Sequence, residues 1–194
     1  MKKIISILLS AMLLSGISAA AAEYPADMDT YKLADWRMSM ELENEGTKDE
    51  GYRVVNSVKD DSNGDIWINS PDTTMQQGGV SGAAATLTGT SDYMTVFDDP
   101  IGKMLNGCSE LTVATWVKFD AFPENETLML VDEDGAFRIA VSHSGELHVA
   151  MNTDRVDWYA ETINVDSAIT PNKWYHIAVT MDDSGATLYI NGIR

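Results

Sequence analysis

Three consecutive acidic residues at a tight turn are the side chains best suited to holding a metal ion. The stretch VDEDGAFRIAV places Asp132, Glu133 and Asp134 directly before a run that is typical of a β-strand. Calcium prefers several oxygen ligands, which are mostly carboxylates and backbone carbonyls supplied by loops. An ordinary hairpin turn at Asp134-Gly135 explains the same residues without any ion. Calcium is therefore the candidate cofactor, and a plain turn is the alternative.

A second group of side chains is suited to binding sugars. The stretch NTDRVDWYAETIN, from 152 to 164, contains two adjacent aromatic residues among amide and charged ones. A Trp or Tyr ring can pack against a sugar ring while its polar tip forms a hydrogen bond. Because neighbouring residues on a strand point to opposite faces, we expect one ring in the core and the other at the surface. The candidate ligand-binding residues are Trp158, Tyr159, Asn152 and Asp154.

The remaining reactive residues are not arranged as in known classes of enzyme. Glycoside hydrolysis requires two carboxylates across the scissile bond, one of them with a raised pKa, and the acids of ELENE (41–45) have no apolar flanks to bury them. The three histidines, His143, His148 and His176, do not have the spacing of zinc ligands. We therefore predict no catalytic residues and a protein that is not an enzyme.

Residues 1–22 have the pattern of a secretory signal peptide. Lys2 and Lys3 precede an apolar run that ends in small residues, and cleavage is expected near Ala22. The mature domain would then cover 23–194 and be secreted, periplasmic or attached to the cell surface. The short positively charged segment is typical of bacteria.

Composition narrows the choice of partners. The 194 residues include 30 acidic and 13 basic side chains, a formal net charge of −17. Such a chain repels nucleic acid and anionic membranes, so neither is an expected partner. No stretch after the leader is long and apolar enough to span a bilayer. Cys108 is the single cysteine, so an internal disulfide is impossible and the fold must depend on its core.

The order of short apolar runs and turn residues predicts an all-β fold. Strands are expected within 91–98, 110–120 and 158–166, and three more within 127–153, with turns at Asp132–Gly135 and Ser142–Gly145. Residues 173–192 are expected to form a hairpin that turns at Asp182–Gly185. Regularly spaced strands of this length favour a two-sheet antiparallel sandwich. The region 41–82 is expected to contain long connections and few strands.

Several segments resemble the laminin G-like modules of the concanavalin A-like lectin/glucanase superfamily. ELTVATWVKFD (110–120) is similar to a characteristic strand of these modules, and NKWYHIAVTMDDSGATLYINGIR (172–194) is similar to a hairpin that follows it in them. ATLTGTSDYMTVFD (85–98) resembles an earlier pair of strands, and LADWRMS (33–39) resembles the opening strand. The matching residues of the two long segments are Leu111, Thr112, Val113, Trp116, Val117, Lys118, Trp174, His176, Ala178, Val179, Leu188, Tyr189, Asn191 and Gly192.

The resemblance implies a jelly-roll sandwich of two antiparallel sheets. In the family, further strands follow the Asn191-Gly192 turn, so the domain is expected to be incomplete at its C-terminal end, a fragment of a longer product. Pentraxins, which are relatives in the superfamily, begin their calcium site with an acidic residue before a similar strand. On that resemblance Asp134 is the first candidate ligand and Asp132 the second, with the other ligands expected after the final hairpin.

The resemblance also implies a function. We expect an exported, non-catalytic module that recognises carbohydrate or an extracellular protein, or acts in adhesion, within a longer polypeptide that has further domains. Calcium is the candidate aid to binding. The alternatives are a glycoside hydrolase of the same superfamily and a structural spacer domain.

Overall fold

The computed structural model describes residues 4–8, 32–34, 52–54, 66–68, 74–80, 82–87, 93–96, 110–122, 124, 127–133, 137–151, 161–166, 169–182 and 184–194. The chain divides into two compact units, Met1–Cys108 and Ser109–Arg194. Within these described ranges, no helix has the length and hydrophobicity needed to cross a membrane.

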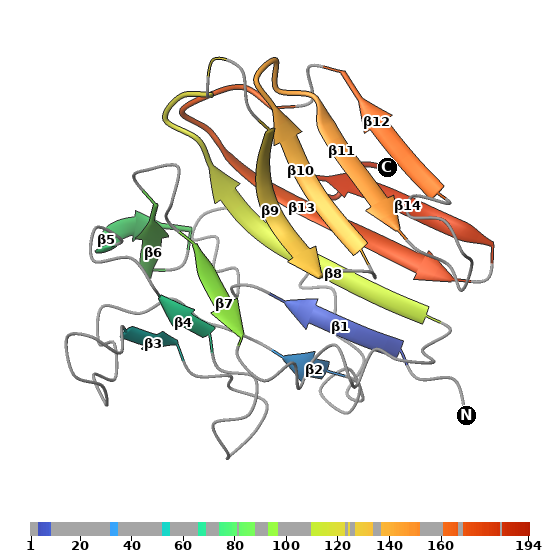
Figure 1. The fold of residues 1–194 in the computed structure, drawn as a ribbon, viewed down its shortest axis with the longest axis horizontal. Helices are drawn as coiled ribbons and strands as arrows, with labels where there is room; N and C mark the ends of the chain where they lie inside the picture. The colour runs from blue at the N-terminus through green and yellow to red at the C-terminus, as the bar shows by residue number, and fades with distance from the viewer. Residues whose placement is uncertain are drawn as a thin grey trace, which may run out of the picture. The chain divides into compact units, whose positions relative to one another are not determined.

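The first unit contains short strands in three groups (Figure 1). Strands β1 and β2 pair in parallel, β3, β4 and β7 form an antiparallel sheet in the order β3-β4-β7, and β5 and β6 form a hairpin. Their bounds are β1 Ile4–Leu8, β2 Lys32–Ala34, β3 Tyr52–Val54, β4 Ile66–Ile68, β5 Thr74–Gly79, β6 Gly82–Thr86 and β7 Met94–Val96.

These strands meet some of the expectations. Strand β7 lies inside the strand predicted at 91–98, and β1 lies inside the predicted leader, 1–22. Among its described residues, the region 41–82 contains β3, β4, β5 and the first residue of β6, and β3 and β4 are three residues long. Its long connections stay a prediction, because the rest of the region lies outside the described residues.

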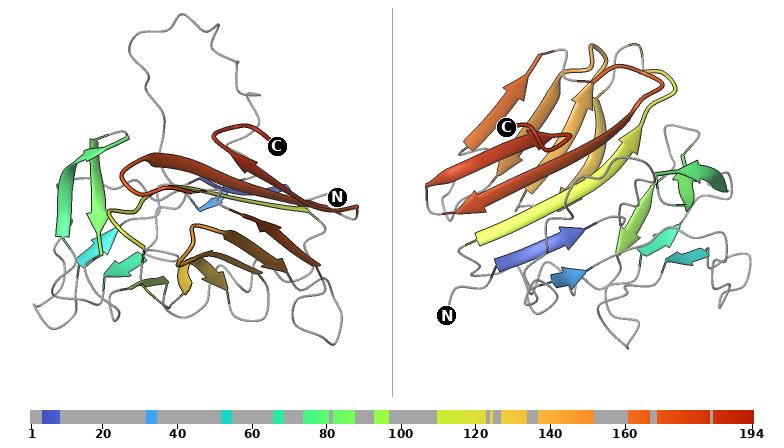
Figure 2. Two further views of the ribbon diagram at one scale, coloured as in Figure 1. Left: turned by 90° about the horizontal axis from the view of Figure 1, so that it is seen from above. Right: turned by 180° about the vertical axis from the view of Figure 1, so that it is seen from behind.

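The second unit is a two-layer sandwich of antiparallel strands. One layer has the order β12-β11-β10-β9, and β14, β13 and β8 pair in that order in the other. Figure 2 shows the two layers stacked on each other. The bounds are β8 Glu110–Lys118, β9 Thr127–Glu133, β10 Phe137–Ser142, β11 Leu147–Met151, β12 Glu161–Val165, β13 Trp174–Asp182 and β14 Gly185–Ile190. The predicted all-β antiparallel sandwich is confirmed, and so are the turn at Ser142–Gly145 and the final hairpin.

Alternate residues of these strands form the core. In β13, Tyr175, Ile177 and Val179 are buried, whereas the residues between them are only half-buried and face outward. Burial of one such aliphatic side chain stabilises the fold by about 1.5–3 kcal/mol. The side chains with the least exposure are Ile139, Leu147, Ile169, Ile177, Val113, Val141, Val149 and Val179.

One corner of the sandwich joins the two layers through the connection between β12 and β13. The backbone N–H of Ile169 donates to the carbonyl of Gly145, in the β10–β11 turn, at 3.1 Å. Three residues later, the N–H of Asn172 donates to the carbonyl of Phe119, just after β8, at 2.6 Å. The ring of Phe122 packs on Phe119 and lies beside Gly145. The connection is therefore fixed to both layers at once.

The Asn191-Gly192 turn has the backbone expected of a tight hairpin. Both residues have positive φ, 52° and 78°, and Ile190 and Ile193 exchange two backbone hydrogen bonds of 2.9 and 3.0 Å across the turn. Positive φ at both central residues is typical of a type I′ turn, for which Asn-Gly is the preferred pair. The Asn191 side chain also accepts a hydrogen bond from the N–H of His176.

Replacement of Gly145 by alanine tests the corner. A Cβ at Gly145 would lie 2.3 Å from the Ile169 carbonyl oxygen, and the φ of +77° is unfavourable for alanine. Gly192 has the same φ, +78°, but no atom within 4 Å of its Cβ position, so it is the matched control. We expect Gly192→Ala to lower the free energy of unfolding by about 1–2 kcal/mol, because only its left-handed backbone is strained. Gly145→Ala should lower it clearly more, as measured by denaturant unfolding. Equal costs would contradict the close approach.

Tyr175 makes a second test possible at the same connection. Its hydroxyl accepts a hydrogen bond from the N–H of Thr170 at 3.1 Å and bonds with the Thr170 hydroxyl at 2.9 Å. Tyr175→Phe removes both bonds and leaves the N–H without this partner, whereas Thr170→Val removes one. At about 1 kcal/mol a bond, we expect Tyr175→Phe to lower the free energy of unfolding by about 2 kcal/mol and Thr170→Val by about half as much. A larger loss for Thr170→Val would contradict this assignment.

Candidate functional site

The outward side of β9, β10, β11 and β12 carries a group of charged and amide side chains that contact one another. We call it the outer face and define it by Met129, Asp132, Arg138, Glu146, His148 and Asn164. The register places them together because Asp132 lies opposite Arg138, Met129 opposite Ala140, Ala140 opposite His148, and His148 opposite Asn164.

A β-bulge decides which residues of β9 reach this face. The register shifts between Ile139 and Ala140, whose partners are Val131 and Met129, so one extra residue, Leu130, is inserted in β9. A bulge turns the residues on its two sides to faces that simple alternation would not give. Met129 and Asp132 are three positions apart and still share the outer face.

Asp132 and Arg138 form a fork-shaped pair across neighbouring strands. The Nε of Arg138 donates to Oδ1 of Asp132 at 2.9 Å, and its Nη2 donates to Oδ2 at 3.1 Å. Two parallel charge-assisted bonds fix the relative orientation of the guanidinium and the carboxylate planes. Both side chains are part-exposed, 26% and 35%. The pair therefore presents a rigid, planar, polar surface to solvent.

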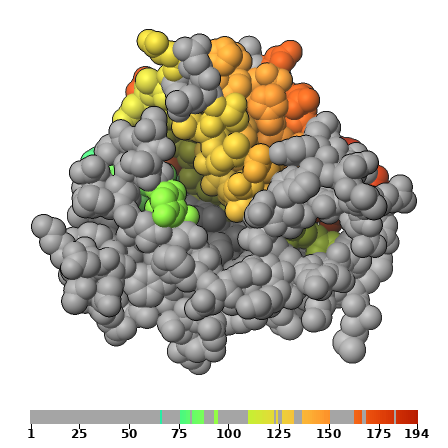
Figure 3. Space-filling view, viewed as in Figure 1, coloured from blue at the N-terminus to red at the C-terminus, as the bar shows by residue number. Residues whose placement is uncertain are grey.

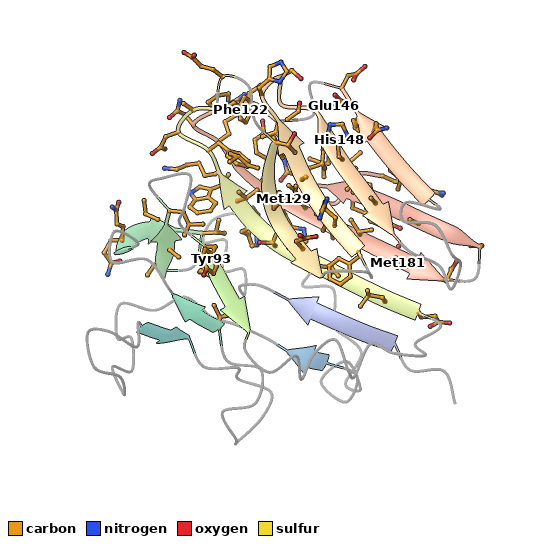
Figure 4. The ribbon with its side chains drawn as sticks, viewed as in Figure 1. Tyr93, Phe122, Met129, Glu146, His148 and Met181 are labelled. Atoms are coloured by element: carbon orange, nitrogen blue, oxygen red, sulfur yellow. The ribbon has the colours of Figure 1, made fainter. Side chains whose placement is uncertain are left out.

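His148 is held between two oxygen atoms. Its Nδ1 donates to Oδ1 of Asn164 at 2.6 Å, and its Nε2 lies 3.5 Å from Oε2 of Glu146. A hydrogen bond at Nδ1 fixes the orientation of the ring and its tautomer, so that in a neutral ring Nε2 is an acceptor. Figure 4 shows the side chains of Glu146 and His148 close to each other where β11 begins.

Apolar groups lie among these polar ones. Met129 is 49% exposed, unusual for a large apolar side chain of a strand. Ala140 and Ala150, on the same face, are buried, at 2% and 8% exposure. Figure 3 shows yellow and orange atoms of this layer at the surface, and Figure 4 shows Met129 over β9 and β10.

The outward side of β8 and β13 is aromatic. The Trp116 and His176 rings lie with centroids 5.1 Å apart on paired residues, and the Nζ of Lys118 is 5.8 Å from the ring centroid of Trp174. All but Lys118 are half-buried. These contacts add to the backbone pairing of the two strands. An aromatic pair contributes about 0.5–1.5 kcal/mol to stability.

Comparison with protein families gives one match. The model described as concanavalin A-like lectin/glucanases superfamily, Laminin_G_3, matches residues 88–194, more than half of the chain. The chain belongs to this superfamily. No match was found among curated proteins or among solved structures. Laminin G-like domains commonly bind carbohydrates or extracellular proteins, and the wider superfamily also includes glycosidases.

Only one predicted site residue of this laminin G-like chain is among the described residues. Asp132 lies on the outer face, and both of its carboxylate oxygens accept from Arg138. A calcium ion there would have to compete with the guanidinium. The other predicted residues, Trp158, Tyr159, Asn152, Asp154 and Asp134, lie outside the described ranges, so their placement stays a prediction.

The described residues do not by themselves fit a calcium site. Across the described ranges, no group of three or more His, Cys, Asp or Glu side chains is close enough to hold a metal ion. Asp132 alone supplies too few oxygens, since calcium takes six to eight ligands.

The sequence reading missed Arg138, Glu146 and Asn164 as parts of a candidate site. A partial signal was present, because Arg138 in β10 and His148 in β11 each stand between two buried apolar residues. The cross-strand pairing of Asp132 with Arg138 depends on the register of the β9–β10 hairpin, which the residue types alone do not give.

His176 makes stability depend on pH. Burial lowers the pKa of His176 from its usual value of 6.5. The unfolded chain then binds a proton more readily than the folded one, so stability is greatest above about pH 6.5 and falls as the pH drops from there toward the folded-state pKa.

The His176→Phe variant tests this effect. Phenylalanine keeps an aromatic ring against Trp116 and removes the titration. We expect the wild type to lose more unfolding free energy than His176→Phe between pH 7.5 and 5.5, measured by guanidinium denaturation. Identical pH profiles in the two proteins would show that His176 is not the group responsible.

Proposed function

We propose that the chain is a non-catalytic module that binds carbohydrate outside the cytoplasm. The observation that carries the proposal is the outer face, a set of paired polar side chains and an exposed methionine on strands of a laminin G-like sandwich. Sugars present hydroxyl groups that both donate and accept, next to apolar C–H surfaces. Rigid planar polar groups beside an apolar side chain suit such a ligand.

The state of the carboxylates supports binding over hydrolysis. A glycosidase acid must hold a proton at its working pH and release it to the leaving oxygen. Both carboxylate oxygens of Asp132 instead accept hydrogen bonds from the guanidinium of Arg138. Glu146 lies beside an imidazole nitrogen at the end of β11. In these two contacts, each carboxylate orients a neighbouring side chain.

Export and calcium belong to the proposal as separate parts. The leader at 1–22 supports secretion to the periplasm, the cell surface or the medium. N-terminal sequencing of the secreted protein tests this part, with Glu23 as the expected first residue. Calcium would be held by Asp134, with Asp132 as a second ligand if it leaves Arg138.

Retention on immobilised polysaccharides tests the function. We expect the protein to be slowed in affinity electrophoresis through gels that contain at least one of laminarin, mannan, xyloglucan or dextran, relative to gels without polysaccharide. We also expect no reducing ends to appear on incubation with the same polymers, because the described carboxylates are not arranged for hydrolysis.

Any other result of these two measurements supports one of the alternative functions. Release of reducing ends would support the glycosidase. The absence of retention by neutral and anionic polysaccharides alike would leave protein recognition or a spacer role. Repeating the measurement with EDTA and then with added calcium tests whether calcium assists binding. Retention that is lost with EDTA and recovered with calcium supports a calcium-assisted site, and unchanged retention excludes one.

A further inference from the structure

We propose that the outer face of β9–β12 binds a neutral polysaccharide chain, with Met129 against a sugar ring and the Asp132–Arg138 and His148–Asn164 pairs bonding to its hydroxyls. This inference rests on the proposed function and moves the site from the predicted loop at 152–160 to a strand surface.

The chemistry of the face matches sugar hydroxyls. Asp132 uses one bond at each carboxylate oxygen for Arg138, and each oxygen has further lone pairs that can accept from a hydroxyl. In a neutral His148, Nδ1 is occupied by Asn164 and Nε2 can accept. The Asn164 amide nitrogen supplies donors. The face thus has both kinds of group, as a diol requires.

The balance of charge selects an uncharged ligand. Among the described groups of the face, Arg138 is paired with Asp132, and Glu146 lies beside the His148 ring, so the described side chains carry no excess of positive charge. The chain as a whole carries a formal net charge of −17. A uronate or a sulfated sugar would meet repulsion that cationic groups on this face do not offset.

The position of the face lowers the entropic cost of binding. All four strands are paired along their length, and the polar side chains are already held by one another, so little freedom is lost when a ligand bonds to them. Met129 supplies exposed apolar area beside the Asp132–Arg138 pair. Its sulfur and methyl groups can adapt to the C–H face of a pyranose ring.

Paired substitutions at Met129 test the face. Met129 is 49% exposed, so Met129→Glu is expected to leave the melting temperature nearly unchanged while it places a third carboxylate on the face. We expect at least a tenfold loss of affinity for the neutral polysaccharide that binds the wild type. Met129→Leu, which keeps the apolar surface, should bind within about twofold of wild type. Thr187→Ala, on the outward side of β14 in the other layer, is the control for a remote outward substitution.

The three histidines give a readout that does not depend on mutation. His148 lies on the outer face, His143 in the β10–β11 turn, and His176 on the outward side of the other layer. When an oligosaccharide of the bound polymer is added, we expect the imidazole NMR signals of His148 to shift. Those of His143 and His176 should stay in place.

The outcomes separate this inference from the function on which it rests. If neutral polysaccharide binds, but Met129→Glu binds as wild type and Trp158→Ala does not, the loop is the site and the inference is wrong while the function stands. Binding of alginate or dextran sulfate in place of neutral polymers also overturns the inference alone. Failure to bind any polysaccharide overturns both.

Discussion

The close approach of Gly145 to Ile169 is the constraint on which the rest of the second unit depends. The β10–β11 turn can reach the β12–β13 connection only because no side chain stands between them, since a Cβ would lie 2.3 Å from a carbonyl oxygen. That contact places Ile169 in the core at 2% exposure, and the next residues are held by Tyr175 and Phe119. One glycine thus sets the spacing of two layers that share no backbone ladder in the described strands of this unit.

The two outward surfaces of the sandwich carry different kinds of side chain, aromatic on β8 and β13 and polar on β9 to β12. On β8 and β13, the rings of Trp116 and His176 pack on each other and the ammonium group of Lys118 lies over the Trp174 ring, which strengthens the pairing of strands far apart in the sequence. On β9 to β12, the same positions hold polar groups in pairs, and sequence-adjacent strands need no such reinforcement. The second surface is the one that we propose as the ligand-binding surface.

The sequence predicted the strands of the second unit well because their signals are local. Asn191-Gly192 indicates a tight turn on its own, and β13 shows a plain alternation of buried and outward residues that burial confirms. The composition of the outer face was harder to predict. The bulge at Leu130 breaks the alternation in β9, so Met129 and Asp132 cannot be assigned to one side without the register.

The contact that holds Asp132 was hidden for a related reason. An acidic triplet before a strand is compatible with a turn, a metal site or an ion pair, and the ion pair depends on which residue lies across the hairpin. Arg138 is that residue, six positions later. The aromatic pair at 158 and 159 lies outside the described ranges, so its assignment rests on residue type alone.

The order of the strands has a consequence for how the sandwich forms. Strands β9 to β12 follow one another and pair with their neighbours in the chain, whereas the pairing of β8 with β13 encloses that whole meander in a loop. Closing a long loop costs entropy before any contact repays it, so such pairings are slow. The meander is expected to pair first, and β13 to add to β8 afterwards. The surface assigned to the ligand would then belong to the earliest part of the fold, and the aromatic contacts of Trp116 and Trp174 to the step that completes it.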